Sequence, residues 1–481
     1  MLQLGFPVVL AVLVRLPGIC RPLLGHFATK NVTYAMIARN WVLGRASFWH
    51  PTMDCMAGGD RGWHLLEVPV SAYLAGAGWS IFGGSLDVWG RASCIAFSAG
   101  AVALMFALVR RWHGPIAACG ASVALALSPS AVIFGQSFML EAPLMFFALA
   151  SFFCLERWLS GNRRRWLLLA ATSFALLLLT KIYMLVLALP LAALVWRRMA
   201  NTARAEGLRT GGEFILAALA AVAPAALWYA HVWQIAAPGE PSSAHVFYSV
   251  RQSATVHGWP HPLLTSADFY RRLLDDLSGW MLTPIGAALA LAGFWNSAWR
   301  RHAAWLAATA ILVAALPSKF YELSYYDLAI LPVFCLLVGL GWQAVYERIK
   351  PGRFGIACTL LAAIVFSLRH AAHPAFATPA EDRGVLAAAA AVRARTRPEE
   401  PVATLHGAAS DLLYYCDRPG WAFSVNDRRL NERLQIARER GARWLVVADL
   451  DSALGSRSAA ALAKLRAVGE GEDFRIYELA E

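Results

Sequence analysis

Two glutamates lie beside or inside apolar runs, where a charged group is costly. Glu67 is part of "LEVPVSAYL", directly before Val68-Pro69 and a long apolar stretch, and Glu141 is part of "FMLEAPLMFF". A carboxylate in such a place has to face a cavity or a charged partner, because lipid does not solvate it. Both glutamates are therefore candidate acid–base groups, with a structural ion pair as the alternative for Glu141.

Two aspartates in the same loop as Glu67 are further catalytic candidates. Asp54 and Asp60 belong to "FWHPTMDCMAGGDRGWHLLEV", and a turn after two glycines also explains Asp60. His64 stands three residues before Glu67, a spacing that on a helix places both on one face as metal ligands. Two ligands make a weak site, so no metal residue is assigned and a divalent metal stays open. His64 is expected at the membrane interface, where it can line a substrate.

The few lysines of the chain form a second set of candidates. Three of them, Lys30, Lys181 and Lys319, fall at the ends of apolar runs that we predict to be extracytoplasmic. Basic residues usually stay on the cytoplasmic side, so a cation kept outside can meet an anionic headgroup or a phosphate. We expect these lysines to line one donor-phosphate cavity, with chance placement as the alternative. Arg91, at the end of "DVWGR", is a further candidate unless it only anchors its helix.

Two aromatic or amphipathic stretches border the same outer face. Tyr325 and Tyr326 stand at the outer start of an apolar run, where they can contact sugar or lipid. Interfacial anchoring is the plainer interpretation of that pair. The stretch "TSADFYRRLLDDLSG" predicts an amphipathic helix with Ser266 as its cap, and it can cover a cavity.

The elements that must position these groups are membrane spans. Of the 481 residues 58% are hydrophobic and only 15% are charged, whereas soluble domains have about 25% charged residues. Apolar stretches recur along most of the chain, each about long enough to cross a bilayer. The net charge of +12 does not indicate nucleic-acid binding, because the arginines cluster in short links between apolar runs. That placement is typical of cytoplasmic loops.

About eleven spans, with the N-terminus inside, place every basic cluster in the cytoplasm. The run "WLLLAATSFALLLLTKIYMLVLALPLAALVW" is divided into two short spans hinged at Thr180-Lys181. One long helix would put a basic cluster outside, and neighbouring helices can cover the mismatch of a short span. The predicted spans are 4–24, 91–109, 115–133, 139–158, 166–180, 183–196, 213–233, 280–297, 303–317, 327–345 and 354–370.

Three larger segments are then extracytoplasmic. Residues 25–90 and 234–279 are external loops of an all-α polytopic membrane domain that spans residues 1–372. The stretch "TKNVTYAMIARNWVLG" predicts an amphipathic helix in the membrane interface, capped by Asn31 and stopped by Gly44. Residues 373–481 alternate helix-like runs with strand-like runs such as "PVATL" and "RWLVVA". They predict a small C-terminal α/β extracytoplasmic domain.

Several motifs in order resemble the GT-C superfamily of membrane glycosyltransferases. The similarity is to the bacterial branch akin to lipid A aminoarabinose transferases and protein O-mannosyltransferases, which includes the Rgt-like sugar transferases. The motifs are "RLPG", "YAMIARN", "LEVPVSAYL", "FGGSLDVWGRA", "FMLEAPLMFF", "LTKIYM", "SYYDLAILPVFCLLVG" and the tail stretch "LLYYCDRPGW".

The resemblance implies a reaction as well as a GT-C fold. Such enzymes move a hexosyl or pentosyl group, with inversion, from a polyprenyl-phosphate donor to a lipid, polysaccharide or protein acceptor at the extracytoplasmic face. A lysine or arginine would stabilise the leaving phosphate, and a carboxylate would polarise the acceptor. It implies a multi-pass protein of a bacterial inner membrane that serves cell-envelope lipopolysaccharide or glycan biosynthesis. No cofactor and no nucleic-acid partner are implied.

The chain departs from that family pattern at one place. The family usually carries an acidic pair just before the "YAxIAR" helix, whereas this sequence has Lys30 and Asn31. Three explanations stay open. The base has moved to Asp54, Asp60 or Glu67; phosphate departure drives the reaction with help from lysine; or the chain is a non-catalytic relative. Glu67 and Glu141 match acids of the family's two external loops.

A lipid-linked sugar transporter or flippase is the rival function from another class. A flippase predicts charged groups through the middle of several spans, along a path between the two faces. Here the ionisable groups collect at the external ends of the predicted spans. A non-catalytic assembly protein, whose tail recruits partners, is the remaining alternative.

Overall fold

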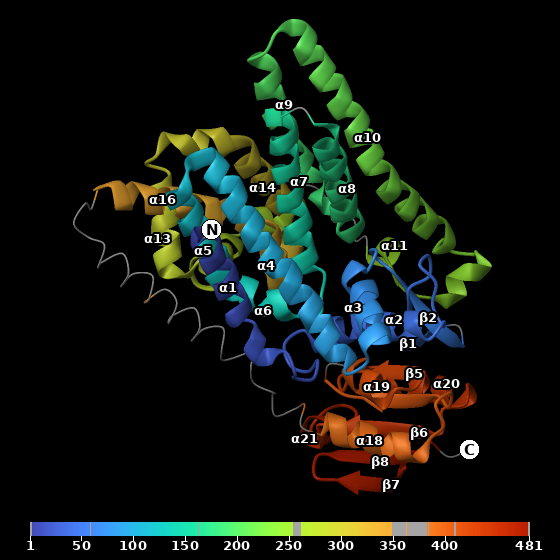
Figure 1. Ribbon diagram of the computed structural model, residues 1–481. Helices are drawn as coiled ribbons and strands as arrows, with labels where there is room; N and C mark the ends of the chain where they lie inside the picture. The colour runs from blue at the N-terminus through green and yellow to red at the C-terminus, as the bar shows by residue number, and fades with distance from the viewer. Residues whose placement is uncertain are drawn as a thin grey trace. The chain divides into compact units, whose positions relative to one another are not determined.

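The computed structural model divides the chain into two compact units, and each is described by itself (Figure 1). It describes residues 2–57, 59–161, 163–253, 261–348, 362, 382, 384–407 and 410–479. The helical unit comprises Met1–Ile19, Ala92–Ala230 and Thr255–His373, and the sheet unit comprises Cys20–Arg91, His231–Ala254 and Pro374–Glu481. The sheet unit thus combines the tail with the first external segment and the first part of the second, where the sequence predicts a separate tail domain.

The helical unit is built from apolar helices joined by short links. In chain order these are α1 (Leu2–Leu13), η1 (Leu16–Gly18), α4 (Leu86–His113, which starts in the sheet unit), α5 (Pro115–Leu127), α6 (Pro129–Gln136), α7 (Glu141–Gly161), α8 (Arg164–Thr180), η2 (Ile182–Leu187), α9 (Ala188–Ala200), α10 (Arg204–Ile235), η4 (Pro262–Thr265), α12 (Ala267–Asp275), η5 (Asp276–Met281), α13 (Thr283–Gly293), η6 (Ser297–His302), α14 (Ala303–Ala315), α15 (Pro317–Glu322), η7 (Ser324–Ala329) and α16 (Leu331–Arg348). The 3₁₀ and π turns between helices shorten many of them.

Four of the described helices are long and apolar enough to cross a membrane, against about eleven predicted spans. They are Leu86–His113, Glu141–Gly161, Ile182–Ala200 and Arg204–Ile235, and a bent pair made of α5 and α6 gives a fifth. Helices are present at most other predicted spans, but α13, α14 and their neighbours are too short to cross alone. The predicted span 354–370 lies outside the described residues.

The predicted break at Thr180-Lys181 is confirmed. Helix α8 ends at Thr180, and Lys181 has an extended backbone with φ −154° and ψ 109°. The chain then passes through η2 into α9. The break places the Lys181 side chain inside an otherwise apolar stretch. It also interrupts the backbone hydrogen bonds that a continuous helix would make internally.

Arg15 compensates for the break between α5 and α6, which bend by 59°. A break inside an apolar helix leaves carbonyl groups without intrahelical donors. The Arg15 guanidinium is fully buried and donates to the carbonyl oxygens of Ala11, Ala126 and Ala131 at 2.8–2.9 Å. The arginine of "RLPG" therefore stabilises the bend.

Small residues allow α16 to contact α5 and α13 at backbone distance. A Cβ atom on Gly341 would lie 1.8 Å from the Leu289 carbonyl oxygen, and one on Gly339 would lie 2.4 Å from that of Ala117. No side chain fits at either position. Close approach of this kind is how helices pack in membranes, where van der Waals contact replaces the hydrophobic drive.

The sheet unit contains one eight-stranded sheet assembled from three stretches of chain. Its order is β3-β2-β1-β5-β4-β6-β8-β7. Strands β4, β5 and β6 are parallel, and β1 joins them through the Cys55–Gly420 pair. The strands are β1 (Thr52–Ala57), β2 (Asp60–Leu65), β3 (Val246–Ser249), β4 (Val402–Leu405), β5 (Gly420–Phe423), β6 (Trp444–Ala448), β7 (Arg466–Gly471) and β8 (Phe474–Glu478).

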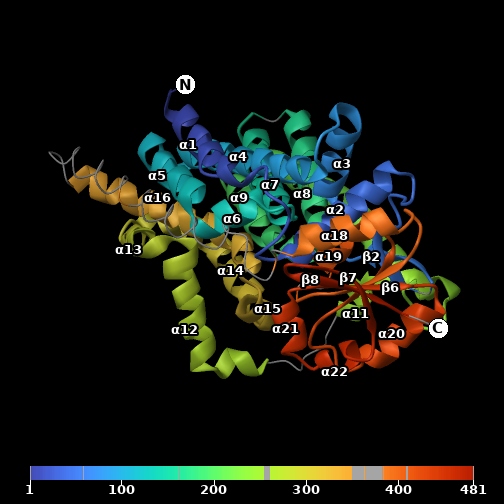
Figure 2. The ribbon, with the colours of Figure 1, turned by 90° about the horizontal axis from the view of Figure 1, so that it is seen from below.

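Helices of the tail cover both faces of its strands, as Figure 2 shows. Helices α18 and α19 lie on one side, whereas α20, α21 and α22 lie on the other. The core beneath α20 is apolar and includes Leu405, Phe423 and Leu434. The helices of the sheet unit are α2 (Ala28–Val42), α3 (Val70–Phe82), η3 (Pro241–His245), α11 (Val250–Ser253), α18 (Val385–Arg395), α19 (Ser410–Cys416), α20 (Leu430–Glu439), α21 (Leu450–Leu454) and α22 (Ala459–Leu462).

Helix α2 forms where the sequence predicts an amphipathic helix, but it is more buried than that prediction implies. Ten of its 15 residues are buried, including Asn31 through Ala38 without a gap, so its burial is not confined to one side. It packs against α3, β1 and α19 inside the sheet unit. Asn31 lies within its first turn and does not cap it, whereas Gly44 follows its end with φ +69°, as predicted.

Candidate active site

Glu141 begins α7 in the helical unit with its carboxylate enclosed. The residue is 2% exposed, and neither carboxylate oxygen has a hydrogen-bond partner among the residues that the structure describes. Desolvating a carboxylate without donors costs several kcal/mol. The site is therefore suited to receive a donor group, such as a hydroxyl, that the described part of the chain does not supply.

Lys181 and Glu141 share a neighbour in the same unit. The Tyr183 phenol interacts electrostatically with Lys181, Glu141, Tyr325 and Tyr326. Lys181 is 6% exposed and is held in the extended break between α8 and η2. The structure thus brings one predicted catalytic acid, one predicted phosphate ligand and both predicted substrate-lining tyrosines into one neighbourhood.

Aromatic rings form one wall of this neighbourhood. Tyr183 stacks on Tyr326 with ring centroids 5.2 Å apart, and Tyr325 lies 5.1 Å from Tyr326. Phe134 of α6 contacts Tyr325, and Phe320 of α15 contacts Tyr326. Flat faces of this kind suit the apolar face of a sugar ring or an isoprenoid chain. Lys319 lies half-buried in α15, next to Phe320.

Asp327 is a buried carboxylate that the sequence reasoning missed. It is fully buried in η7, two residues after Tyr325, and neither of its oxygens has a partner among the described residues. It interacts electrostatically with Asp276 and Arg272. The available signal was its position in "SYYDLAILPVF", where an acid precedes an apolar run as Glu67 does.

Glu67 lies in the sheet unit, hydrogen-bonded to Tyr34 of "YAMIARN". The Tyr34 hydroxyl donates to Glu67 Oε1, and both side chains are almost fully buried. His64 packs its ring edge against Tyr34 at 6.4 Å between centroids, and it pairs with Tyr248 of β3. The structure therefore joins two predicted residues, His64 and Glu67, through a tyrosine of α2. They lie on β2 and its following loop, and not on one helical face.

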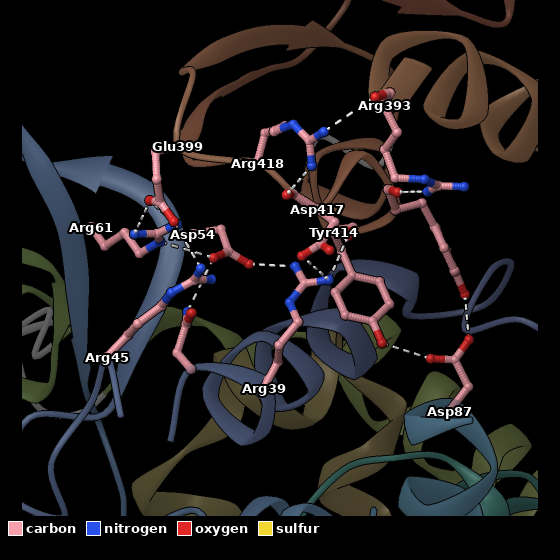
Figure 3. A network of polar contacts seen from close by, with 12 residues as sticks. Arg39, Arg45, Asp54, Arg61, Asp87, Arg393, Glu399, Tyr414, Asp417 and Arg418 are labelled. Carbon is pink, nitrogen blue, oxygen red and sulfur yellow. Dashed lines mark hydrogen bonds and ion pairs between the residues drawn. The ribbon is translucent and has the colours of Figure 1, made fainter. Parts of the chain in front are cut away.

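Asp54 is the centre of a network of charges in the sheet unit, shown in Figure 3. Its carboxylate accepts from Arg39 at 2.6 Å, Arg61 at 3.2 Å and Asn40 at 3.1 Å, and the residue is 2% exposed. Arg39 also pairs with Asp417. Two guanidinium groups neutralise Asp54, which favours holding β1 in place over accepting a proton.

The same network joins the tail to the first external segment. Arg61 and Arg45 both pair with Glu399, while Tyr414 and Tyr415 of α19 donate to Asp87 at 2.7 and 2.8 Å (Figure 3). These bonds explain why the loop and the tail fold as one unit. The tyrosine pair belongs to the "LLYYCDRPGW" stretch.

The other predicted site residues of the sheet unit differ in exposure and in their contacts. Asp60 is 75% exposed at the β1–β2 turn and lies 3.6 Å from His245. Arg91 donates to the carbonyl oxygens of Arg21 and Pro22, which fits the anchoring alternative. Lys30 lies half-buried in the first turn of α2.

Comparison with known proteins gives the same fold at low sequence identity. The structure of ArnT from Cupriavidus metallidurans, bound to undecaprenyl phosphate, matches with a TM-score of 0.65 and 15% identity. The match covers 99% of this chain and 97% of that chain. The chain has the GT-C fold.

Other proteins with the GT-C fold match over nearly the whole chain. Archaeal oligosaccharyltransferase AglB from Archaeoglobus fulgidus, in complex with an inhibitory peptide and a dolichol-phosphate, has a TM-score of 0.57 and 14% identity, covering 96% of this chain and 71% of that one. Arabinofuranosyltransferase AftD from Mycobacteria has a TM-score of 0.54 and 15% identity, covering 99% and 41%. No curated protein sequence matches.

A family model matches a part of this GT-C chain that holds four of the candidate residues. Residues 67–228 match the model described as dolichyl-phosphate-mannose-protein mannosyltransferase, which is less than half of the chain. Glu67, Arg91, Glu141 and Lys181 all fall in this range. The likeness to solved structures extends to the remainder, including Tyr325 and Asp327.

Proposed function

We propose that the protein is a glycosyltransferase that takes a sugar from a polyprenyl-phosphate donor. The observation that carries the proposal is Glu141, a buried carboxylate that receives no hydrogen bond from the described residues and shares the neighbour Tyr183 with buried Lys181. An acid and a cation gathered within an apolar helical unit suit a lipid-phosphate substrate. The GT-C fold, and the undecaprenyl phosphate bound to ArnT, support the same substrate class.

The proposed reaction is a displacement at the anomeric carbon. The donor's phosphate binds Lys181, whose charge offsets the negative charge that grows on the leaving oxygen. A carboxylate accepts a hydrogen bond from the acceptor hydroxyl or amine and takes its proton as the acceptor attacks the anomeric carbon on the face opposite the phosphate. The carbon–oxygen bond to phosphate breaks with its electrons, and the sugar is transferred with inversion. Polyprenyl phosphate leaves as the second product.

Glu141 and Glu67 are the proposed acids, in preference to Asp54 and Asp60. Asp54 already accepts from two arginines and one asparagine, so its lone pairs are engaged. Asp60 is exposed beside His245. Glu67 accepts a hydrogen bond from Tyr34, and a tyrosine there can orient its carboxylate. Tyr183, Tyr325 and Tyr326 are proposed to contact the sugar or the prenyl chain.

The proposed setting is a bacterial inner membrane, with acceptor and transfer on the extracytoplasmic side. The basic links between apolar helices support cytoplasmic loops on the other side. The proposed acceptor is a lipid, a glycan or a protein.

The decisive experiment is a transfer assay with a labelled undecaprenyl-phosphate sugar and purified full-length protein. Glu141→Gln should lower kcat at least about 100-fold, as expected for loss of a general base, with little change in donor affinity. Lys181→Gln should weaken donor binding at least about 10-fold, equivalent to 1.4 kcal/mol. Exposed Glu206 and Lys464 provide the matched controls Glu206→Gln and Lys464→Gln.

Three outcomes would count against the proposal. Full activity of both test variants would remove Glu141 and Lys181 from the site. Donor movement across vesicles without any transferred label would favour a flippase. Donor binding without turnover or movement would favour a non-catalytic relative.

A further inference from the structure

Three buried side chains gather in the sheet unit, and the proposed transfer reaction does not use them. Asp382, His406 and Asp411 each offer one donor atom, and these atoms all lie within 4.8 Å of one another. Their exposed fractions are 3%, 0% and 0%. Two buried carboxylates carry negative charge that a nearby positive charge must compensate, because buried charges in proteins are paired or coordinate a metal.

The fold places this cluster at the carboxyl end of a central parallel strand. His406 directly follows β4, which lies between β5 and β6, and Asp411 is the second residue of α19. Open parallel sheets hold their ligands at this edge. Asp382 precedes α18, and its Oδ2 accepts from the backbone N–H of Gly25 at 2.6 Å. Three separate stretches of the sheet unit thus meet here.

Among the described residues, the hydrogen bonds of the cluster do not reach Asp411 Oδ2. His406 Nδ1 lies 2.9 Å from Asp411 Oδ1, which also accepts from the Leu412 N–H at 2.6 Å. His406 Nε2 lies 3.7 Å from Asp382 Oδ1. Asp411 Oδ2 is buried and has no partner among the described residues. A protonated His406 would offset the negative charge of one carboxylate and leave Asp411 Oδ2 without a partner among the described residues. A divalent cation would offset the charges of both carboxylates.

We propose that Asp382, His406 and Asp411 bind a divalent transition-metal cation, with Zn²⁺ as the first choice. One imidazole nitrogen with two carboxylates suits Zn²⁺ or Mn²⁺, whereas Mg²⁺ and Ca²⁺ prefer oxygen ligands alone. Donor atoms about 2.1 Å from a tetrahedral zinc lie about 3.4 Å apart. One donor atom from each of the three side chains lies within 4.8 Å of the other two, so small side-chain movements would reach that spacing. The ion ties Asp382 to β4 and α19 and stabilises the sheet unit.

Metal analysis of the full-length chain tests the proposal directly. The protein is purified in detergent without a histidine tag, and its metal content is measured by mass spectrometry. We expect close to one zinc or manganese ion per chain. After chelation, adding Zn²⁺ at about 100 times its Kd should raise the unfolding temperature by about 5 °C, while Mg²⁺ should not. Protein that neither carries nor responds to either transition metal would overturn the proposal.

Variants locate the ion. His406→Gln should lower the metal content at least fivefold and abolish the zinc-dependent shift, since it removes the nitrogen ligand. Asp451→Asn, on exposed α21 of the same tail, should keep both, because it changes a carboxylate outside the cluster. Equal metal content in His406→Gln and wild type would place the ion elsewhere and refute this site. If His406→Gln does not fold, the wild-type measurements still decide. Because transfer activity is not the readout, failure here leaves the proposed function unaffected.

Discussion

Asp54 and Asp60 lie six residues apart in one loop, and burial separates them. The sequence presents both as acids near a predicted membrane surface. Asp54 is enclosed by Arg39, Arg61 and Asn40, whereas Asp60 is 75% exposed. Two buried charges that lose their partner are far more costly than an exposed pair that loses one.

Asp54→Asn should therefore destabilise the protein by about 3 kcal/mol, because Arg39 and Arg61 lose their shared carboxylate. Asp60→Asn should change stability by less than about 0.5 kcal/mol. Denaturant unfolding, followed in detergent, gives both values. Equal stability of the two variants would mean that the Asp54 network contributes little.

His302 gives the helical unit an acid-sensitive position. The residue is 4% exposed, and its Nε2 lies 2.7 Å from that of His113. Burial, followed by the charges of His113, Arg301 and Arg197, lowers the pKa of His302 from 6.5 to about 3. The unfolded chain therefore binds this proton more readily than the folded chain between these two pH values.

Stability should be unaffected by His302 above pH 7 and should fall as the pH drops from 6.5 towards 3. At pH 5 the loss from this residue is about 2 kcal/mol. His302→Asn removes that contribution, so its unfolding temperature should depend less steeply on pH between 7.5 and 5. Parallel curves for wild type and variant would contradict the assignment.

A residue could be predicted from the sequence when its own position was informative, and not when its environment depends on residues far away in the sequence. The enclosed positions of Glu141 and Lys181 can be predicted, because a charge in an apolar run is anomalous by itself. The roles of Asp54 and Asp382 depend on Arg39, His406 and other residues that lie far away in sequence. Asp327 was overlooked although its signal equalled that of Glu67.

At the scale of elements, hydrophobic runs located the helices but not their lengths. The break at Lys181 was predictable from the charges flanking a 31-residue run. The burial of α2 was not, because it depends on how the chain folds back: β1 and α3 of the same segment and α19 of the distant tail all pack on it. Strands β5 and β7 were missed, since neither is long or apolar enough to be recognised alone.

The contact of α16 with α5 makes a direct test of element packing. Gly339→Val should destabilise the helical unit by about 2 kcal/mol or more, since even a Cβ would lie 2.4 Å from the Ala117 carbonyl oxygen. Gly212→Ala, in exposed α10 with nothing within 4 Å of the added Cβ, should be neutral or slightly stabilising. Thermal unfolding of both variants measures the difference. A fully stable Gly339→Val protein would refute the close packing.

At the scale of the whole molecule, the tail forms part of the sheet unit together with the first external segment. Its strand β5 pairs with β1, and α19 bonds to Asp87 of the first external segment. The sequence predicts an α/β tail with its own boundaries, but strand pairing between distant segments leaves no local trace. Motif order was enough to indicate the GT-C fold.

A chain stopped after His373 should lose the structure of residues 20–91 as well. Without β5, strand β1 has an unpaired edge, and Asp54 loses the neighbours of its network in the tail. Limited proteolysis should then cut within 45–65 at least about 10-fold faster, because cleavage follows the population of the open form. A chain stopped after Leu479, which keeps every strand, is the control. Unchanged resistance would show that the first segment folds without the tail.

The Cys55–Gly420 pairing also means that β1 is synthesised long before its partner strand β5. About 360 residues separate the first strand from its partner, so at roughly 5–20 residues per second the ribosome needs roughly 20–70 s to deliver β5. For that interval the edge of β1 in the growing protein lacks its partner strand. Exposed strand edges attract other chains, so this edge is open to wrong pairing until β5 has been synthesised.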